Sequence, residues 1–156
     1  MLLGACRPGP PIWRDVVVDY SNDWVELVRG REVTQVFRPN HDDVGAVAVV
    51  VSNAGGMARD CEVVLRLRAK DSTVDLAERR IECAFLPAED WVRLDFAPLA
   101  GSARERIVIS VHSPDGRPGE APRLAFANLP GIYPDAKLRF NETEVPGALR
   151  FVSYHH

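Results

Sequence analysis

The stretch CEVVLRLRAK, residues 61–70, alternates apolar and polar side chains with a period of two. Successive side chains of a β-strand point to opposite faces of its sheet, so one face of this stretch would carry cysteine, valine, leucine and alanine. The other face would carry mainly charged side chains, because glutamate, arginine and lysine fill the alternate positions. The stretch therefore predicts a strand with one face in the core and the other in water.

A polar turn at Asp71 and Ser72 follows, and the alternation then resumes with a one-residue phase shift near Arg79. Such a shift is typical of a β-bulge. In a hairpin around this turn, the sequence numbers of two residues that face each other add up to about 143. One bulged residue near Arg79 raises that sum to about 144 for the pairs beyond the bulge. The raised sum places Cys61 opposite Cys83, and opposed Cα atoms lie about 4.5–5.5 Å apart, which a disulfide spans. The sequence thus predicts either a disulfide between these cysteines or two small buried thiols.

Short apolar or alternating runs recur along the chain and predict about ten strands, separated by turns that contain Gly, Pro or Asp. The runs lie at residues 15–20, 33–38, 44–51, 61–70, 74–85, 91–96, 107–112, 124–126, 136–140 and 149–154. A helical turn is expected only at residues 24–28. Many short strands at regular spacing predict an all-β fold, an antiparallel jelly-roll β-sandwich of about 8–10 strands.

The composition places limits on the partners of this chain. The 156 residues carry a net charge of −3 with both signs scattered, so no nucleic-acid partner is expected. No apolar run reaches the roughly 18 residues of a membrane span, so contact with a membrane would need a lipid anchor or a larger parent protein. The 17 arginines against 2 lysines suggest a GC-rich bacterial genome.

The first residues, MLLGAC, resemble the end of a bacterial lipoprotein signal, which implies lipid attachment at Cys6. The alternative is an ordinary exposed cysteine. Prolines dominate the next few residues and indicate an extended linker. We therefore expect a leader and linker over residues 1–12 and one sandwich domain over residues 13–156.

Three segments in order, VTQVF (33–37), WVRLDFAPL (91–99) and IVISVHS (107–113), resemble jelly-roll sandwiches of the galactose-binding-like and carbohydrate-binding-module kind. Residues 133–154 are similar to extracytoplasmic sandwich domains attached to bacterial membrane glycosyltransferases. The resemblance implies a non-enzymatic accessory module in the periplasm or at the cell surface, with carbohydrate or an envelope glycan as its ligand.

Two other functions stay open at this stage. One is an envelope protein-interaction or scaffolding domain without a small ligand. The other, less favoured, is a divergent glycan hydrolase, which would need two carboxylates facing each other across a cleft, and the sequence does not pair its acids. The motif Gly-x-Ser-x-Gly of a hydrolase triad and the histidine spacings of zinc sites are absent.

A sugar site needs flat aromatic rings and planar polar groups. Trp24 and Tyr133 are candidates because they lie in predicted loops, where rings have fewer packing obligations. Arg139 and Asn141 share a face just after the Tyr133 loop. Trp91 is out of phase with the core residues of its strand, so it is either a stacking platform or a cap on the end of the sandwich.

Asp42 and Asp43 precede the apolar run at residues 44–51, and their carboxylates could hold calcium or belong to a solvated turn. No other cofactor is expected. His112 projects from the polar side of its strand beside Ser110 and is expected to be a surface histidine.

Overall fold

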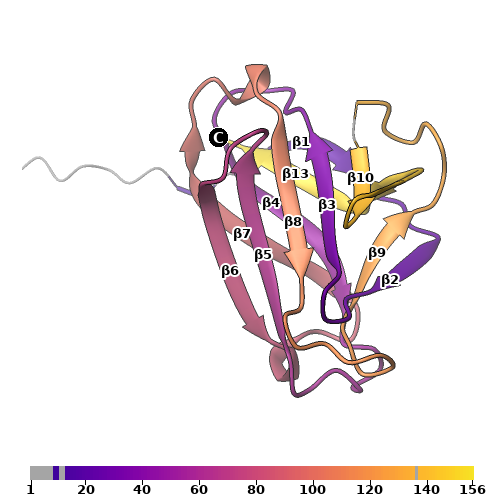
Figure 1. Cartoon of the computed structure of the whole chain (residues 1–156). Coiled ribbons are helices and arrows are strands. Elements are labelled where there is room, and N and C mark those ends of the chain that lie inside the picture. Colours follow the sequence, from indigo (N-terminus) through magenta and orange to yellow (C-terminus); the bar gives the residue numbers. More distant parts are fainter. Residues whose placement is uncertain (1–8, 11–12, 136) are drawn as a thin grey trace, which may run out of the picture.

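The computed structural model describes residues 9–10, 13–135 and 137–156, and these form two antiparallel β-sheets with two single-turn 3₁₀ helices (Figure 1). The described residues contain thirteen strands, more than the number expected, because several are short. The strands are β1 (Trp13–Val18), β2 (Asp23–Glu26), β3 (Glu32–Phe37), β4 (Val44–Ser52), β5 (Glu62–Ala69), β6 (Asp75–Glu82), β7 (Asp90–Leu99), β8 (Ile107–His112), β9 (Arg123–Ala127), β10 (Lys137–Phe140), β11 (Thr143–Val145), β12 (Ala148–Leu149) and β13 (Phe151–His155). The helices are η1 (Cys83–Phe85) and η2 (Ser102–Arg104). Among the described residues, no helix has the length and apolar character that crossing a membrane requires.

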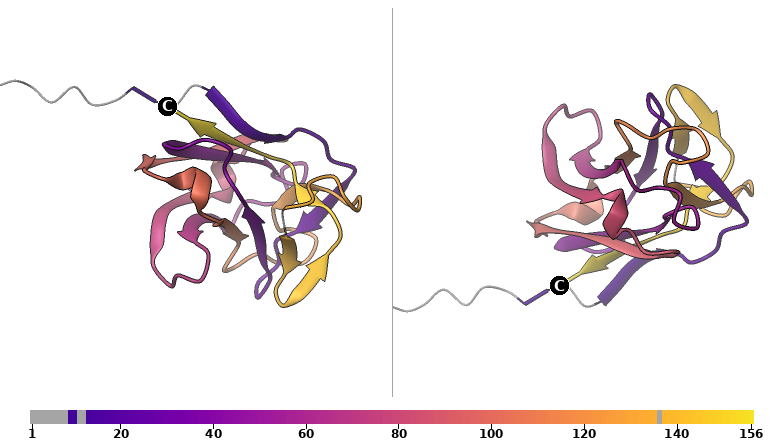
Figure 2. Two further views of the ribbon diagram at one scale, coloured as in Figure 1. Left: turned by 90° about the horizontal axis from the view of Figure 1, so that it is seen from above. Right: turned by 90° about the horizontal axis from the view of Figure 1, so that it is seen from below.

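The strands form a seven-stranded and a six-stranded sheet, which lie one over the other when seen from above and below (Figure 2). The first follows the order β1-β13-β4-β9-β12, with β2 also paired to β9 and β7 to β4. The second follows the order β11-β10-β3-β8-β5-β6. Most consecutive strands lie in different sheets, as in β2–β3, β3–β4, β6–β7 and β8–β9, and this winding is a jelly roll. The predicted fold class is confirmed.

The core fills the space between the two sheets. Residues that alternate along each strand supply it, so Val47 and Val49 of β4 are fully buried, as are Leu65 and Leu67 of β5. A buried polar residue also connects the sheets. The Gln35 side chain donates a hydrogen bond to the Val36 carbonyl (3.0 Å) and accepts one from the Leu149 amide (2.9 Å). Because the buried Gln35 side-chain amide has a hydrogen-bond partner for both its nitrogen and its oxygen, it adds specificity to an otherwise apolar contact between the sheets.

The prediction of a helical turn at residues 24–28 is wrong, because residues 24–26 belong to strand β2. Val25 is buried in the core, and β2 runs antiparallel to β9 with Trp24 opposite Ala125. The alternation of Trp24, Val25 and Glu26 is too short to be recognised alone, and pairing with a distant strand decides the conformation.

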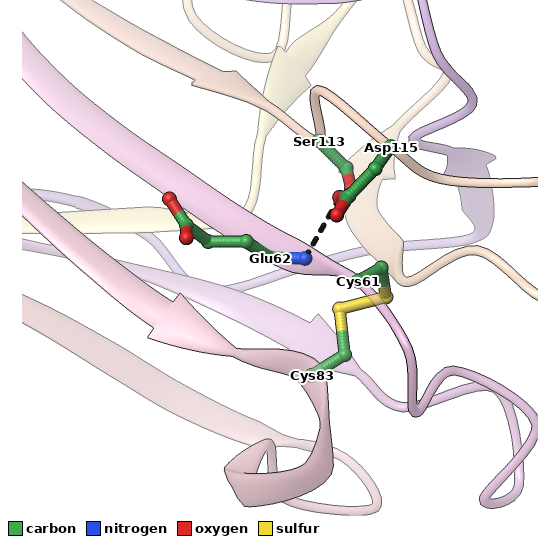
Figure 3. Close-up of a disulfide and its surroundings, with 5 residues drawn as sticks. All are labelled: Cys61, Glu62, Cys83, Ser113 and Asp115. Carbon is green, nitrogen blue, oxygen red and sulfur yellow. Dashed lines mark hydrogen bonds between the residues drawn. A yellow bond between two sulfur atoms is a disulfide. The ribbon is translucent and has the colours of Figure 1, made fainter.

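The β5–β6 hairpin has the register that the cysteine positions require. Glu62 pairs with Glu82, and one step further a disulfide joins Cys61 and Cys83, with 5.2 Å between their Cα atoms (Figure 3). The bulge expected near Arg79 lies elsewhere. The register instead shifts by one residue close to the turn, between Leu67 and Arg68 of β5.

The disulfide lies where the start of β5 meets the loop after β8 (Figure 3). There the Asp115 carboxylate accepts a hydrogen bond from the Glu62 amide (3.0 Å). The lipidation predicted at Cys6 concerns a residue outside the described part of the chain.

Candidate functional site

The outer side of β4 is covered although it faces away from the core. Val47, Val49 and Val51 belong to the core, so Ala46, Ala48 and Val50 point to the other face of the sheet. Yet these three residues are only 0–2% exposed. Larger side chains on the neighbouring strands therefore close over β4.

The strand register identifies those covering side chains. On one side, β7 places Trp91, Arg93 and Asp95 opposite the three outward residues of β4. On the other side, β13 places Val152 and Tyr154 opposite the two alanines. Paired residues share a face of the sheet, so all five side chains lie on the outer face.

Two arginines reach across β4 to aromatic rings on its far side. The guanidinium carbon of Arg93 lies 4.5 Å from the centre of the Tyr154 ring. The guanidinium carbon of Arg150, just before β13, lies 5.4 Å from the centre of the Trp91 ring. Both distances fall within the range of cation–π attraction. The two contacts hold the aromatic rings in place above the small residues of β4.

Each of these arginines also has an acidic partner. The Arg93 Nε donates a hydrogen bond to the Asp95 carboxylate (2.9 Å). The Arg150 Nε donates one to the Asp19 carboxylate (2.9 Å), in the segment after β1. A guanidinium held at Nε by a carboxylate has less rotational freedom, so each plane has a fixed orientation.

Trp24 lies on the same outer face. Its partner on β9 is Ala125, and the neighbouring pair, Leu124 with Val51, joins β9 to β4 through core residues. Ala125 is fully buried and therefore covered by the side chains around it. The strand order β2, β9, β4, β7 separates Trp24 from Trp91 by three strand spacings, about 14 Å.

We call the surface formed by Trp24, Trp91, Arg93, Arg150 and Tyr154 the outer aromatic face. Its rings are half-buried, so each keeps part of its surface open to solvent. Flat rings of this kind can stack on the C–H faces of sugar rings, while guanidinium groups donate paired hydrogen bonds to oxygen atoms. This arrangement is suited to binding a polar ligand that has apolar faces.

The sequence identified only part of this face. It proposed Trp24 and Trp91 but missed Arg93, Arg150 and Tyr154. The period-two pattern of residues 149–154 contains a signal that could have found the last two, because Arg150 and Tyr154 alternate with buried Phe151 and Ser153.

Tyr133 lies in a different place and has a structural contact. Its ring packs edge-on against Phe151, with 6.0 Å between ring centres, and its hydroxyl donates a hydrogen bond to the Arg38 carbonyl (3.2 Å). Burial raises the pKa of this hydroxyl above its ordinary value. Tyr133 lines a separate pocket of about 530 Å³, together with Lys137 and Glu144.

Arg139 and Asn141 belong to the six-stranded sheet and its edge, so the structure does not bring them together with the two tryptophans. Arg139 is exposed and pairs with Thr34 of β3. The Asn141 side chain accepts a hydrogen bond from the Glu32 amide (2.8 Å), in a turn where its own φ is 54°. Asn141 therefore has a structural role at the strand end.

The Asp42 carboxylate accepts a hydrogen bond from the Ala103 amide (3.2 Å), and the neighbouring Asp43 has φ 60°. Within the described ranges, no group of three or more His, Cys, Asp or Glu side chains could hold a metal ion. Calcium at these two acids stays a prediction.

A histidine cluster that the sequence did not suggest lies next to these acids. His41 Nδ1 is 2.6 Å from a carboxylate oxygen of Asp15, whose side chain is fully buried, and the His41 ring stacks on His155 at 4.2 Å. Ser153 donates a hydrogen bond to the same carboxylate (3.1 Å). The cluster joins β1, β13 and the β3–β4 loop at one end of the sandwich.

A second pocket, of about 380 Å³, lies beside the disulfide. Charged side chains of both signs line it, among them Arg59, Asp60, Asp115, Arg117 and Glu120. It has no aromatic lining residue, so it lacks the ring on which a sugar would stack.

The sequence matches no model of a known protein family, and it matches no curated protein.

Proposed function

We propose that this chain is a non-enzymatic accessory module that binds carbohydrate outside the bacterial cytoplasm, through the outer aromatic face. One observation carries the proposal: three aromatic rings from three strands, Trp24, Trp91 and Tyr154, share a sheet face whose floor is made of small residues. Guanidinium groups lie over two of these rings, Tyr154 and Trp91, and supply directed hydrogen-bond donors. Jelly-roll connectivity supports the narrower proposal of a galactose-binding-like or carbohydrate-binding-module type.

The disulfide between Cys61 and Cys83 supports the proposed location. Disulfides persist mainly in oxidising compartments, such as the periplasm and the cell surface. An attached lipid or a larger parent protein would then bring the module to the envelope.

The acids on this face favour binding over hydrolysis. A glycoside hydrolase needs two carboxyl groups that flank the scissile bond, about 5–9.5 Å apart. Asp19 and Asp95 each accept a hydrogen bond from an arginine, at 2.9 Å in both cases. Each of these carboxylates is thus engaged by an arginine of the same face and is not placed as one of two free carboxyl groups that flank a scissile bond.

A glycan array probed with the purified full chain tests this function. Affinity electrophoresis in gels that contain the bound polysaccharide then compares the wild type with Trp24→Ala and Trp91→Ala. We expect each substitution to weaken binding roughly tenfold, because each removes a stacking ring. Tyr133→Phe is the matched control, and we expect it to bind like the wild type because it removes only a hydroxyl at the other pocket.

Two results would overturn the proposal. Binding to none of the glycans would favour the alternative of an envelope protein-interaction domain. Glycan binding that both tryptophan variants retain in full would place the site away from the outer aromatic face.

A further inference from the structure

The outer aromatic face has the opposite charge balance to the whole chain. Arg14 of β1 pairs with Tyr154 of β13, so it shares the outer face, and its side chain is exposed. With it, the face carries four arginines (Arg14, Arg93, Arg123 and Arg150) against three acids, Asp19, Glu26 and Asp95, whereas the chain has a net charge of −3. Positive charge is thus concentrated on the face that carries the rings.

The excess charge is concentrated around one ring. Arg93 lies over the Tyr154 ring, and Arg14 is next to Tyr154 on the opposite side from β4. Asp95 partners Arg93, but the side chain of Arg14 forms no hydrogen bond or ion pair with any residue that the structure describes. A guanidinium with no acidic partner is therefore exposed beside an aromatic ring that already has a second guanidinium over it.

Two guanidinium groups select a particular kind of ligand group. They offer only N–H donors, so they match a group that only accepts hydrogen bonds and is negatively charged. A planar carboxylate meets the planar guanidinium fork with two parallel bonds, whereas a neutral sugar hydroxyl gains less from it.

From this geometry we infer that the Tyr154 end of the outer aromatic face binds the carboxylate of an acidic sugar, so the preferred ligand is a glycan that contains uronic acid. Arg14 binds the carboxylate, and the sugar ring lies along the aromatic residues. The inference rests on the proposed function, since it names the substrate class of the same face.

Matched polymers test the inference. Polygalacturonate, alginate and hyaluronan are each compared with a counterpart whose carboxyl groups have been reduced to alcohols, by affinity electrophoresis with the full chain. We expect at least one acidic polymer to bind roughly tenfold more tightly than its reduced counterpart. That binding weakens as salt rises from 0.05 to 0.5 M, because salt screens exposed charges.

Arg14→Gln gives the residue-level test. It should weaken binding of the acidic polymer roughly tenfold and leave binding of the reduced polymer unchanged, because it removes one charge-assisted contact. The same substitution at Arg139, exposed on the other sheet, is the matched control and should change neither.

The outcomes separate the two proposals. Equal binding of acidic and reduced polymers, or acidic binding that Arg14→Gln does not weaken, overturns the acidic-sugar inference. If Trp91→Ala still weakens binding of these polymers roughly tenfold, the carbohydrate function stands. Failure of every polymer here and of every glycan on the array overturns both.

Discussion

The guanidinium of Arg93 and the ring of Tyr154 are 4.5 Å apart and come from strands on opposite sides of β4. The contact is formed because β4 presents alanine at its outward positions 46 and 48, so nothing on that strand separates them. The side chains that would bind a ligand are thus positioned by each other as well as by the sheet.

This contact should be measurable as a coupling energy. In a double-mutant cycle of Arg93→Met and Tyr154→Leu, we expect about 0.5–1 kcal/mol of coupling in the free energy of urea unfolding. Both replacements keep apolar bulk over β4, so the cycle isolates the cation–π attraction. A coupling energy of zero would show that the two side chains are only neighbours.

The disulfide should contribute a large part of the stability. It joins residues 22 apart in sequence, and a loop of that size predicts a loss of about 3 kcal/mol when both cysteines become serine. Chemical unfolding with and without dithiothreitol checks this. Reductant should lower the denaturant concentration at which half of the wild-type protein is unfolded. The same midpoint should not change in the variant that carries both Cys61→Ser and Cys83→Ser. A wild-type midpoint that does not respond to reductant under unfolding conditions would contradict the bond's contribution.

A close backbone approach makes Gly147 irreplaceable. A Cβ there would lie 1.8 Å from the Ala127 carbonyl oxygen, and its φ is +111°. Gly147→Ala should therefore cost more than about 3 kcal/mol of unfolding free energy.

Gly131 is the matched control for this substitution. It also has a positive φ, +77°, but no atom lies within 4 Å of a Cβ at that position. Gly131→Ala should cost only about 1 kcal/mol, the strain of the backbone alone. Equal losses of unfolding free energy in Gly147→Ala and Gly131→Ala would show that the backbone around Gly147 moves to make room for the Cβ.

His112 gives the stability a specific pH dependence. Burial, and then the charge of Arg66, lowers the pKa of His112 below its ordinary value, although Glu32 opposes this in part. The unfolded chain then takes up a proton before the folded chain does as the pH falls. The stability from His112 is fully present above about pH 6.5 and is lost as the pH falls toward the lower folded pKa.

The comparison of wild type with His112→Gln isolates this effect. Urea unfolding free energies at pH 7.5 and 5.5 should show a larger loss on acidification for the wild type than for the variant. The other titrating groups are common to both proteins, so their contributions cancel in the comparison. The same loss in both would rule out His112 as a source of acid sensitivity.

Local alternation was enough to predict the register of the cysteine hairpin. Cys61 and Cys83 lie in strands joined by a short turn, so position along the chain nearly determines which residues face each other. The exact place of the bulge was not predictable, because moving it from Arg79 toward the turn leaves the same pairing at Cys61.

The site required knowledge of strand pairing across the whole chain. Alternation alone indicated that Trp91 faces away from the core, but it could not show that Trp24 lies on the same face. That relationship depends on β2 pairing with β9 and on β9 pairing with β4. A ring in a predicted loop is expected to have fewer packing obligations, but Tyr133 contacts Phe151, a residue 18 positions later in the chain that the local sequence does not place beside it.

Chemical-shift mapping tests the central claim most directly. Uniformly ¹⁵N-labelled full chain is titrated with a short oligosaccharide of the glycan that binds most strongly, and amide and indole N–H signals are followed. We predict the largest shifts for the indoles of Trp24 and Trp91 and for the amides of β4, β7 and β13. Shifts confined to residues 130–138 and 144–147, around Tyr133, or to residues 55–61 and 115–120, beside the disulfide, would contradict it.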